Sequence, residues 1–563
     1  MPGYMGFVES LTACNVGGEM DEIGVAVDIG TSGIRAQAVD LTSGAVLSTS
    51  ISLAHPLPGA NVVDHLHFAL EAGVTVATRM LRTAVNRVVE GLKVPVIAIR
   101  RLAVCGNTVQ LSLLQGIEVR DLAYTGARKL ATLGVVKPDR RGVSIQAGIL
   151  QGLELNETCQ VLIPPAVCHT IGADALAMVL QSGILQEQQT ALITDYGTNA
   201  EMALYHNGRI ITASAAAGPA IEGQQISCGM LAAPGAVTDL QLMRNLQYRL
   251  LVLDEQMQVV QGPVVDLERA SLVSSNNAQV KGITGTGVVA ALCEGIQAGL
   301  IELPCIQTPD ACLHLGRKLS LTEEDLQEAG KAFGAIRAGH VTLCHEAGIG
   351  YGDIHVVYMA GAAGTYVDPV KAMFMGWVPA YTKKIVQVGN TSLKMARHLV
   401  MDPAQLDVMQ RLADRIRPDH YVLAASDTFK KMYMLELAYW TEGMPMTSYR
   451  TMLTRYGVKA FPETVSAPEI LQAGAIGDLG NPGVQELSVV SDPGEILLLS
   501  IEGCTACSGC VDACPQSALE LSFKENRPVV QLYHSRCAGV SCKRCEHVCP
   551  EKVMVLSDFF MIR

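Results

Sequence analysis

Cysteine spacing constrains this chain more than any other feature of its sequence. Of the 17 cysteines in 563 residues, eight lie between residues 504 and 549. They form the runs Cys-x2-Cys-x2-Cys-x3-Cys-Pro and Cys-x4-Cys-x2-Cys-x3-Cys-Pro. Thiols this dense in one short segment of a large chain indicate ligation of a metal or a cluster rather than disulfides. The eight residues are Cys504, Cys507, Cys510, Cys514, Cys537, Cys542, Cys545 and Cys549.

Iron–sulfur chemistry fits these spacings better than zinc does. A [4Fe-4S] cubane takes four thiolates, so eight cysteines predict two clusters, and the fourth cysteine of each run ligates the neighbouring cluster. Zinc ribbons, the alternative, place two CxxC pairs far apart. The segment at 498–556 resembles two-cluster bacterial ferredoxins and by itself predicts one-electron transfer. The expected ligand sets are Cys504, Cys507, Cys510 and Cys549 for one cluster, and Cys537, Cys542, Cys545 and Cys514 for the other.

Composition limits the rest of the chain. Charged residues make up 17% of it and apolar residues 49%, which excludes a disordered chain. The net charge of −12 argues against a nucleic-acid-binding surface. No run of about 18 uncharged apolar residues is present, so we expect no transmembrane helix. The first 22 residues carry Glu9 and Glu19 and no Lys or Arg, which does not fit a signal peptide. We therefore expect a cytoplasmic protein that binds neither membrane nor nucleic acid.

A strand–turn–strand unit that occurs twice is the second informative feature. The strand at 25–27 runs into Asp28-Ile29-Gly30-Thr31-Ser32-Gly33, and the strand at 191–194 runs into Asp195-Tyr196-Gly197-Thr198-Asn199. Glycines let the backbone approach a phosphate, and hydroxyl groups add donors. A carboxylate at the strand end orders Mg²⁺ through its waters. We predict two similar halves around a shared cleft, with Asp28 and Asp195 at the metal and phosphate-binding residues Gly30, Thr31, Ser32, Gly197, Thr198 and Asn199.

Two further segments complete the predicted nucleotide site. The strand at 356–360 runs into Gly361-Ala362-Ala363-Gly364, where Gly361 and Gly364 would let an adenosine lie against the backbone. Glu222 is a candidate for orienting a water molecule, although a surface carboxylate explains it equally well.

Several motifs of the chain resemble those of a known group of proteins. The motifs at 27–31, 195–199 and 359–364 resemble the phosphate-1, phosphate-2 and adenosine motifs of the acetate/sugar kinase–Hsp70–actin superfamily. The blocks at 105–108, 216–223 and 388–391 resemble those of the reductive activases of corrinoid proteins. Together with the C-terminal ferredoxin segment, the chain is similar to the methylamine-specific branch from methanogenic archaea. The Thr391-Ser392 pair departs from the alanine-rich residues of relatives.

The resemblance implies a fold and a division of the chain. The fold is α/β, with duplicated ribonuclease-H-like halves of the actin/Hsp70/sugar-kinase type and a small α+β ferredoxin-like C-terminal domain. We expect an N-terminal extension at 1–22, a first half at 23–190, a second half at 191–490 and a ferredoxin domain at 495–563.

The resemblance also implies an activity. It predicts ATP- and Mg²⁺-dependent reduction of an inactive Co(II) corrinoid protein to Co(I), with electrons passing through the two clusters, in methylamine-dependent methanogenesis. The implied partners are corrinoid proteins of methylamine methyltransferase systems and an unidentified low-potential electron donor. Three alternatives remain at this stage: an activator of 2-hydroxyacyl-CoA dehydratases, a small-molecule kinase with a redox module, and a chaperone-like ATPase without redox turnover.

Overall fold

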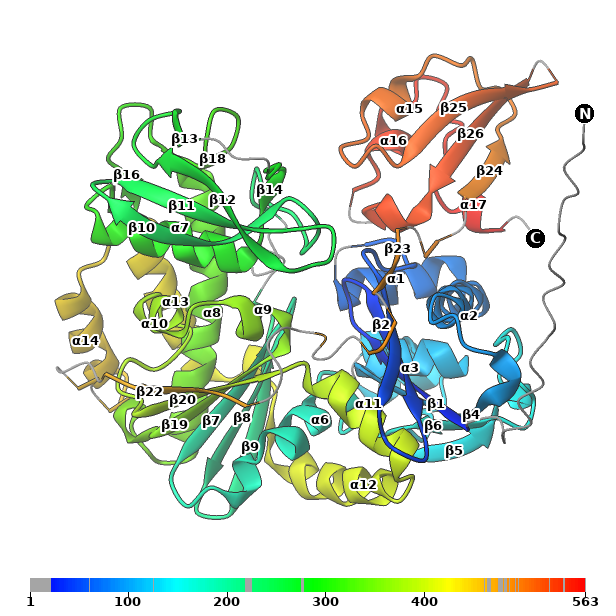
Figure 1. Ribbon diagram of the computed structural model, residues 1–563, viewed down its shortest axis with the longest axis horizontal. Coiled ribbons are helices and arrows are strands. Elements are labelled where there is room, and N and C mark those ends of the chain that lie inside the picture. Colours follow the sequence, from blue (N-terminus) through cyan, green and yellow to red (C-terminus); the bar gives the residue numbers. More distant parts are fainter. Residues whose placement is uncertain are drawn as a thin grey trace, which may run out of the picture.

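Two α/β lobes and a small C-terminal domain make up the protein (Figure 1). The computed structural model describes residues 22–561 except for residues 60, 125, 218–224, 275–277, 460, 463–466, 474–478, 480–482, 486, 492, 495, 526 and 540–541. The predicted N-terminal extension therefore lies almost entirely outside the described residues. None of the described helices has the length and apolar character needed to cross a membrane.

The first lobe is built on a seven-stranded sheet of order β23-β3-β2-β1-β4-β6-β5. Its central strand β1 is buried along its whole length, which explains its nearly uninterrupted apolar sequence. Strands β1 to β3 form an antiparallel meander, and β4 and β6 continue the sheet in parallel. The strands are β1 (Ile23–Ile29), β2 (Ile34–Asp40), β3 (Val46–Ser52), β4 (Ile99–Gly106), β5 (Val143–Gln146), β6 (Gln160–Ile163) and β23 (Ser488–Val490).

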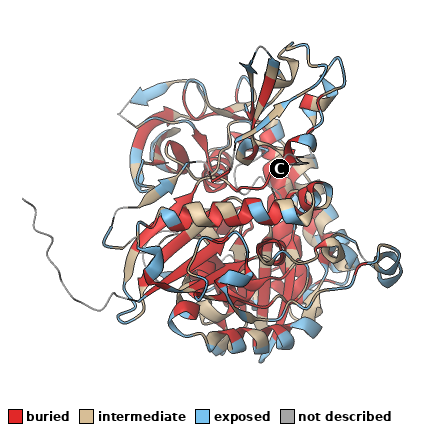
Figure 2. Cartoon of the chain, turned by 90° about the vertical axis from the view of Figure 1, so that its right-hand side faces the viewer, coloured by how far each residue is buried: buried red, intermediate tan, exposed pale blue. Residues whose placement is uncertain are grey.

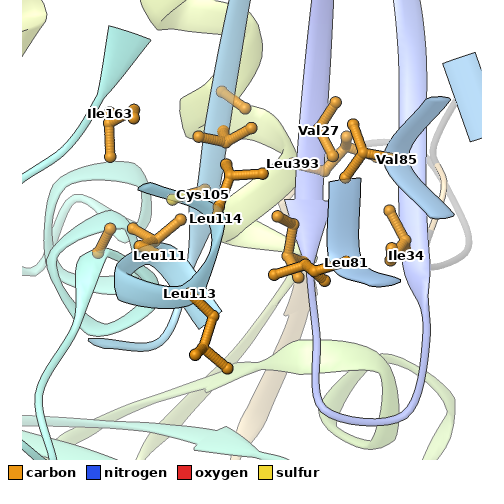
Figure 3. Close-up of a cluster of buried hydrophobic side chains, with 14 of the residues drawn as sticks. Val27, Ile34, Leu81, Val85, Cys105, Leu111, Leu113, Leu114, Ile163 and Leu393 are labelled. Atoms are coloured by element: carbon orange, nitrogen blue, oxygen red, sulfur yellow. The ribbon is translucent and has the colours of Figure 1, made fainter. Parts of the chain in front are cut away.

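Helices cover both faces of this sheet. Figure 3 shows a cluster of buried apolar side chains from α2, α3, α11 and the sheet, among them Leu81, Leu113, Leu393, Val27 and Ile34. Helix α11 follows residue 190 in sequence, yet it packs on β1 and β4 of the first lobe. The helices of this lobe are α1 (Val62–Ala72), α2 (Val74–Glu90), α3 (Thr108–Gln115), α4 (Arg120–Ala123), α5 (Ala127–Thr132), α6 (Ala173–Ser182), α11 (Thr391–Met401) and α12 (Gln405–Ile416).

The second lobe repeats the same strand order. Its sheet runs β21-β9-β8-β7-β19-β20-β22, again with an antiparallel meander followed by parallel strands. The duplication predicted from the repeated turn is therefore present in the fold. The strands are β7 (Ala191–Tyr196), β8 (Ala200–His206), β9 (Arg209–Ala215), β19 (Val356–Ala360), β20 (Lys384–Gly389), β21 (His420–Tyr421) and β22 (Glu469–Gln472). Its helices are α8 (Glu323–Glu346), α9 (Gly361–Tyr366), α10 (Pro369–Phe374), α13 (Asp427–Glu442) and α14 (Met446–Arg455).

A five-stranded sheet of order β13-β12-β11-β10-β14 is inserted into the second lobe, with α7 packed on β10. The repeated motif does not predict this insertion. Two short hairpins, β15–β16 and β17–β18, follow it. These elements are β10 (Ala236–Arg244), β11 (Gln247–Leu253), β12 (Val259–Asp266), β13 (Leu272–Ser274), β14 (Gly282–Ile283), α7 (Gly285–Gln297), β15 (Ile301–Glu302), β16 (Cys305–Ile306), β17 (Cys312–His314) and β18 (Ser320–Thr322).

The C-terminal domain is a three-stranded antiparallel sheet with short helices, and it packs on the first lobe. Phe560 meets Phe68 of α1 edge to face, with ring centroids 4.6 Å apart. Figure 2 shows buried residues concentrated on strands and inward helix faces, with exposed residues on the periphery. The elements are β24 (Ile496–Ser500), α15 (Gly509–Asp512), β25 (Leu519–Lys524), β26 (Arg527–Tyr533), α16 (Arg544–His547) and α17 (Asp558–Met561).

Candidate functional site

The repeated turns meet in one cavity between the two lobes. The hydroxyl oxygens Oγ1 of Thr31 and Thr198 lie 3.1 Å apart, so the two loops touch across the cavity. Parallel pairing of β1 with β4, and of β7 with β19, brings the carboxyl ends of these strands together there. The sequence-predicted residues that line the cavity are Asp28, Gly30, Thr31, Ser32, Asp195, Gly197, Thr198, Asn199 and Gly361.

Glycine is required at two points of this site. In the first loop the Gly30 N–H donates to the Gly33 carbonyl at 3.0 Å, and a Cβ on Gly33 would lie 2.5 Å from the Ser52 carbonyl oxygen. Gly361 has a φ of +79°, and a Cβ there would lie 2.2 Å from Oδ1 of Asp195. The turns therefore hold backbone amides close to the cavity, where larger residues could not fit.

Side chains from separate elements fix the aspartate of the first loop. Asp28 is buried, and its Oδ2 accepts a 2.8 Å hydrogen bond from the Asn390 amide. The Asn390 side-chain oxygen caps α11 by accepting from the Leu393 N–H. The motif at 388–391 thus starts a helix and orients a carboxylate of the cavity at the same time.

Two carboxylates in the cavity were missed by sequence reasoning. Asp174 lies in the first turn of α6, and Glu201 is paired with Asp195 across the β7–β8 ladder. Burial, with the charge of Asp28 adding to it, raises the pKa of Asp174 to about 6. Burial and the charges of Asp174 and Asp195 raise the pKa of Glu201. A glutamate in the largely apolar run at 200–205 was the available signal for Glu201.

Gly364 was predicted for the site but is not among the described residues that line the cavity. A Cβ on Gly364 would lie 3.2 Å from Tyr196, so Gly364 faces protein, while its neighbours Ala362 and Ala363 line the cavity. Glu222 lies outside the described residues.

The eight clustered cysteines fall into two quartets around separate small cavities. Each cavity is otherwise lined mostly by apolar side chains. Within the described residues, no three His, Cys, Asp or Glu side chains converge closely enough to hold a single metal ion. The outer quartet is Cys504, Cys507, Cys510 and Cys549, and the inner quartet is Cys514, Cys537, Cys542 and Cys545.

The quartets differ in their surroundings. Cys507 of the outer quartet is exposed, whereas Cys545 of the inner quartet is buried. Burial raises the pKa of the Cys537 thiol to about 11 and that of Cys545 to about 12. The inner quartet also touches the first lobe, because the Gly59 N–H donates to the Cys537 carbonyl at 2.9 Å. Among the eight cysteines, Cys507 of the outer quartet is the one exposed residue.

Comparison with known proteins identifies the group. The chain matches the RACo middle region over residues 23–187, the C-terminal domain of RACo, the ASKHA domain, over residues 189–450, and a 4Fe-4S dicluster domain over residues 503–553. It is 44% identical over 519 residues to the [Co(II) methylated amine-specific corrinoid protein] reductase of Methanosarcina barkeri, covering 92% of this chain and 95% of that protein. The chain belongs to the reductive activators of corrinoid proteins.

Two further relatives of this activator are more distant. The corrinoid activation enzyme RamQ of Eubacterium limosum is 24% identical over 429 residues, which cover 73% of this chain and 69% of that protein. The solved structure of a reductive activator for corrinoid, iron–sulfur protein has a TM-score of 0.60 and 23% identity, covering 76% of this chain and 68% of the other. The predicted family and fold class are confirmed, and these relatives favour none of the three alternative functions.

Proposed function

We propose that this activator reduces the Co(II) of an inactive corrinoid protein to Co(I) in a reaction driven by ATP. One observation carries the proposal: a cavity with two phosphate-type loops and two cysteine quartets belong to a single chain. The Methanosarcina barkeri relative is named as a reductase of a Co(II) corrinoid protein. We extend that activity to this chain, with corrinoid proteins of methylamine methyltransferase systems as its partners.

The quartets fit two [4Fe-4S] clusters. Four thiols around an apolar cavity are the donor set that such a cluster needs, and the ligand spacing agrees. Bound clusters would supply one-electron carriers of low potential. A separate low-potential electron donor would reduce the clusters.

The cavity between the lobes fits Mg-ATP. Asp28 and Asp195 lie at the ends of β1 and β7, where carboxylates can hold the waters of Mg²⁺. The loops at 30–33 and 197–199 offer amides and hydroxyls to phosphate oxygens. We assign Gly361 to the adenosine-binding surface, with Gly364 allowing the close packing behind it. We assign Glu222 to the orientation of a water molecule.

ATP would act through the hinge between the lobes. A one-electron step against a gap of about 0.2 V costs roughly 5 kcal/mol. A nucleotide that binds the closed lobes more tightly than the open ones can supply such a difference by shifting the population. We infer that the lobes remodel the corrinoid partner while the C-terminal domain delivers the electron.

We propose the chain division 23–190, 191–490 and 495–563 for a cytoplasmic protein. The division by sequence does not coincide fully with the lobes. Strand β23, which belongs to the range 191–490, pairs in parallel with β3 of the first lobe.

A cobalt assay tests the function. The cluster-loaded protein is mixed anaerobically with a Co(II) corrinoid protein, a reductant and Mg-ATP, and the cobalt spectrum is followed. We expect Co(I) to accumulate only with ATP. Equal Co(I) formation without ATP, or none with it, contradicts the proposal. Phosphoryl transfer to a sugar or acid without cobalt reduction would point to a kinase.

A further inference from the structure

A buried pair of histidines lies between the cavity and the inner quartet. The rings of His55 and His65 stack with centroids 4.0 Å apart and an interplanar angle of 17°. Both side chains are buried, and burial lowers the pKa of His65 to about 3. Burial also lowers the pKa of His55, with smaller contributions from His65 and from His534 of the C-terminal domain. The stack is therefore uncharged at neutral pH.

On the cavity side, the first phosphate loop holds the start of the segment that carries His55. The Ser52 hydroxyl at the end of β3 accepts a 2.9 Å hydrogen bond from Ile34, directly after the loop at 30–33. The next residue, Leu53, lines the cavity. His55 follows two residues later. The loop at 30–33 and His55 are thus connected through Ser52 and the two residues that follow it.

A second connection reaches His65 from the end of β4, which lies on the other side of β1 from β2 and β3. Asn107 lines the cavity and caps α3, accepting from the Gln110 N–H at 3.0 Å. The Gln110 side chain, fully buried in the first turn of α3, hydrogen-bonds Nδ1 of His65 at 2.8 Å. Both strand ends that frame the first half of the cavity therefore lead to the histidine stack.

On the other side, the same segment contacts the inner quartet. Gly59 donates to the Cys537 carbonyl, and Gly539 packs on Pro58. The linker strand β23, which leads into the ferredoxin domain, pairs with the cavity end of β3, where Val490 lies opposite Ser52. The docking segment at 53–59 and the covalent linker therefore start from the same point of the first lobe.

We propose that His55 and His65 are positioning residues that transmit nucleotide binding in the cavity to the inner quartet. This inference rests on the proposed function and specifies the path by which the nucleotide site would be coupled to the inner quartet. Close-packed interiors transmit displacement rather than absorb it. Hydrogen bonds with the Gln110 side chain for His55 and with the Gly59 backbone for His65 connect the stack to α3 and to the docking segment.

Hydrogen exchange of the full-length, cluster-loaded protein tests the route. In the wild type we expect Mg-ATP to slow exchange in the loops at 28–33 and 195–199, and to change exchange at 53–65 and 529–539. His55→Phe and Gln110→Leu should keep the iron content and the response of the loops. They should lose the response at 529–539, together with about tenfold of the ATP stimulation of Co(I) formation.

His314→Gln is the matched control, because His314 is a buried histidine of the hairpin β17–β18 that pairs with Asp310. It should respond like the wild type. If the loops do not respond in the wild type, the nucleotide site itself is wrong. If the loops respond but 53–65 and 529–539 do not, the route is wrong and the function stands. Variants that keep full ATP stimulation also overturn the route. Should a variant lose its iron, the wild-type pattern still decides.

Discussion

The nucleotide cavity and the C-terminal domain both arise from a repeated motif, but they use the two copies differently. In the cavity the copies face each other, and Thr31 touches Thr198. In the C-terminal domain the copies interleave, so that Cys514 and Cys549 each join the other run's quartet. One quartet is partly open to solvent, while the other is packed against the first lobe. Repetition in sequence therefore predicts shared chemistry, whereas the surroundings of each copy depend on what packs against it.

The largest effect is expected in the cavity. Asp195→Ala removes a carboxylate that we assign to the Mg²⁺ waters, so ATP-dependent Co(I) formation should be abolished while both clusters remain. Asp28→Ala should have the same effect if both aspartates hold the Mg²⁺ waters. Iron content, nucleotide binding and the cobalt spectrum measure this. Asp427→Ala, at an exposed position of α13, is the control. Normal ATP stimulation in Asp195→Ala would contradict the assignment.

The next effect separates the two quartets. Cys510→Ser and Cys545→Ser should each lose about half of the iron, since each quartet holds one cluster. Cys545 is buried whereas Cys510 is only partly buried, so Cys545→Ser should also lower the melting temperature more than Cys510→Ser does. Nucleotide binding should persist in both. Iron analysis, electron paramagnetic resonance and thermal unfolding distinguish the variants, and equal destabilisation would remove the difference between the quartets.

A smaller effect depends on pH. Because the pKa of Asp174 is raised to about 6, this carboxyl takes up a proton as pH falls through 6 and stops repelling Asp28 or attracting Mg²⁺. Between pH 7 and pH 5 we expect Mg-ATP binding to weaken by up to about tenfold. Asp174→Asn should bind weakly at both pH values and show a flatter profile. A profile unchanged by the substitution would place the titration elsewhere.

The smallest effect concerns the contact between the copies. Thr31→Val removes the hydroxyl that meets Thr198, which should weaken nucleotide binding by about 1 kcal/mol, or roughly fivefold. Isothermal titration of Mg-ATP measures the change. Thr132→Val on α5, where the hydroxyl is exposed, should leave binding unchanged. A loss as large as that of Asp195→Ala would show that the contact itself organises the cavity.

Much of the site could be predicted because local spacing carries it. The turn after β1 needs glycine where its backbone meets Ser52, and that requirement is visible as a motif. Asp174 could not be found this way, since its importance comes from burial beside Asp28, which is remote in sequence. The inserted sheet was missed as well, because its strands belong to neither copy of the repeated motif.

By itself, the sequence determined the chemistry of this protein: thiols at cluster spacing, and two acidic glycine turns that end buried strands. It could do so because these groups act within a few residues of one another. The tertiary structure alone decided which quartet is packed against the first lobe and which carboxylates share the cavity. Those relations join segments far apart in the sequence, and they depend on how the two lobes and the C-terminal domain pack against one another.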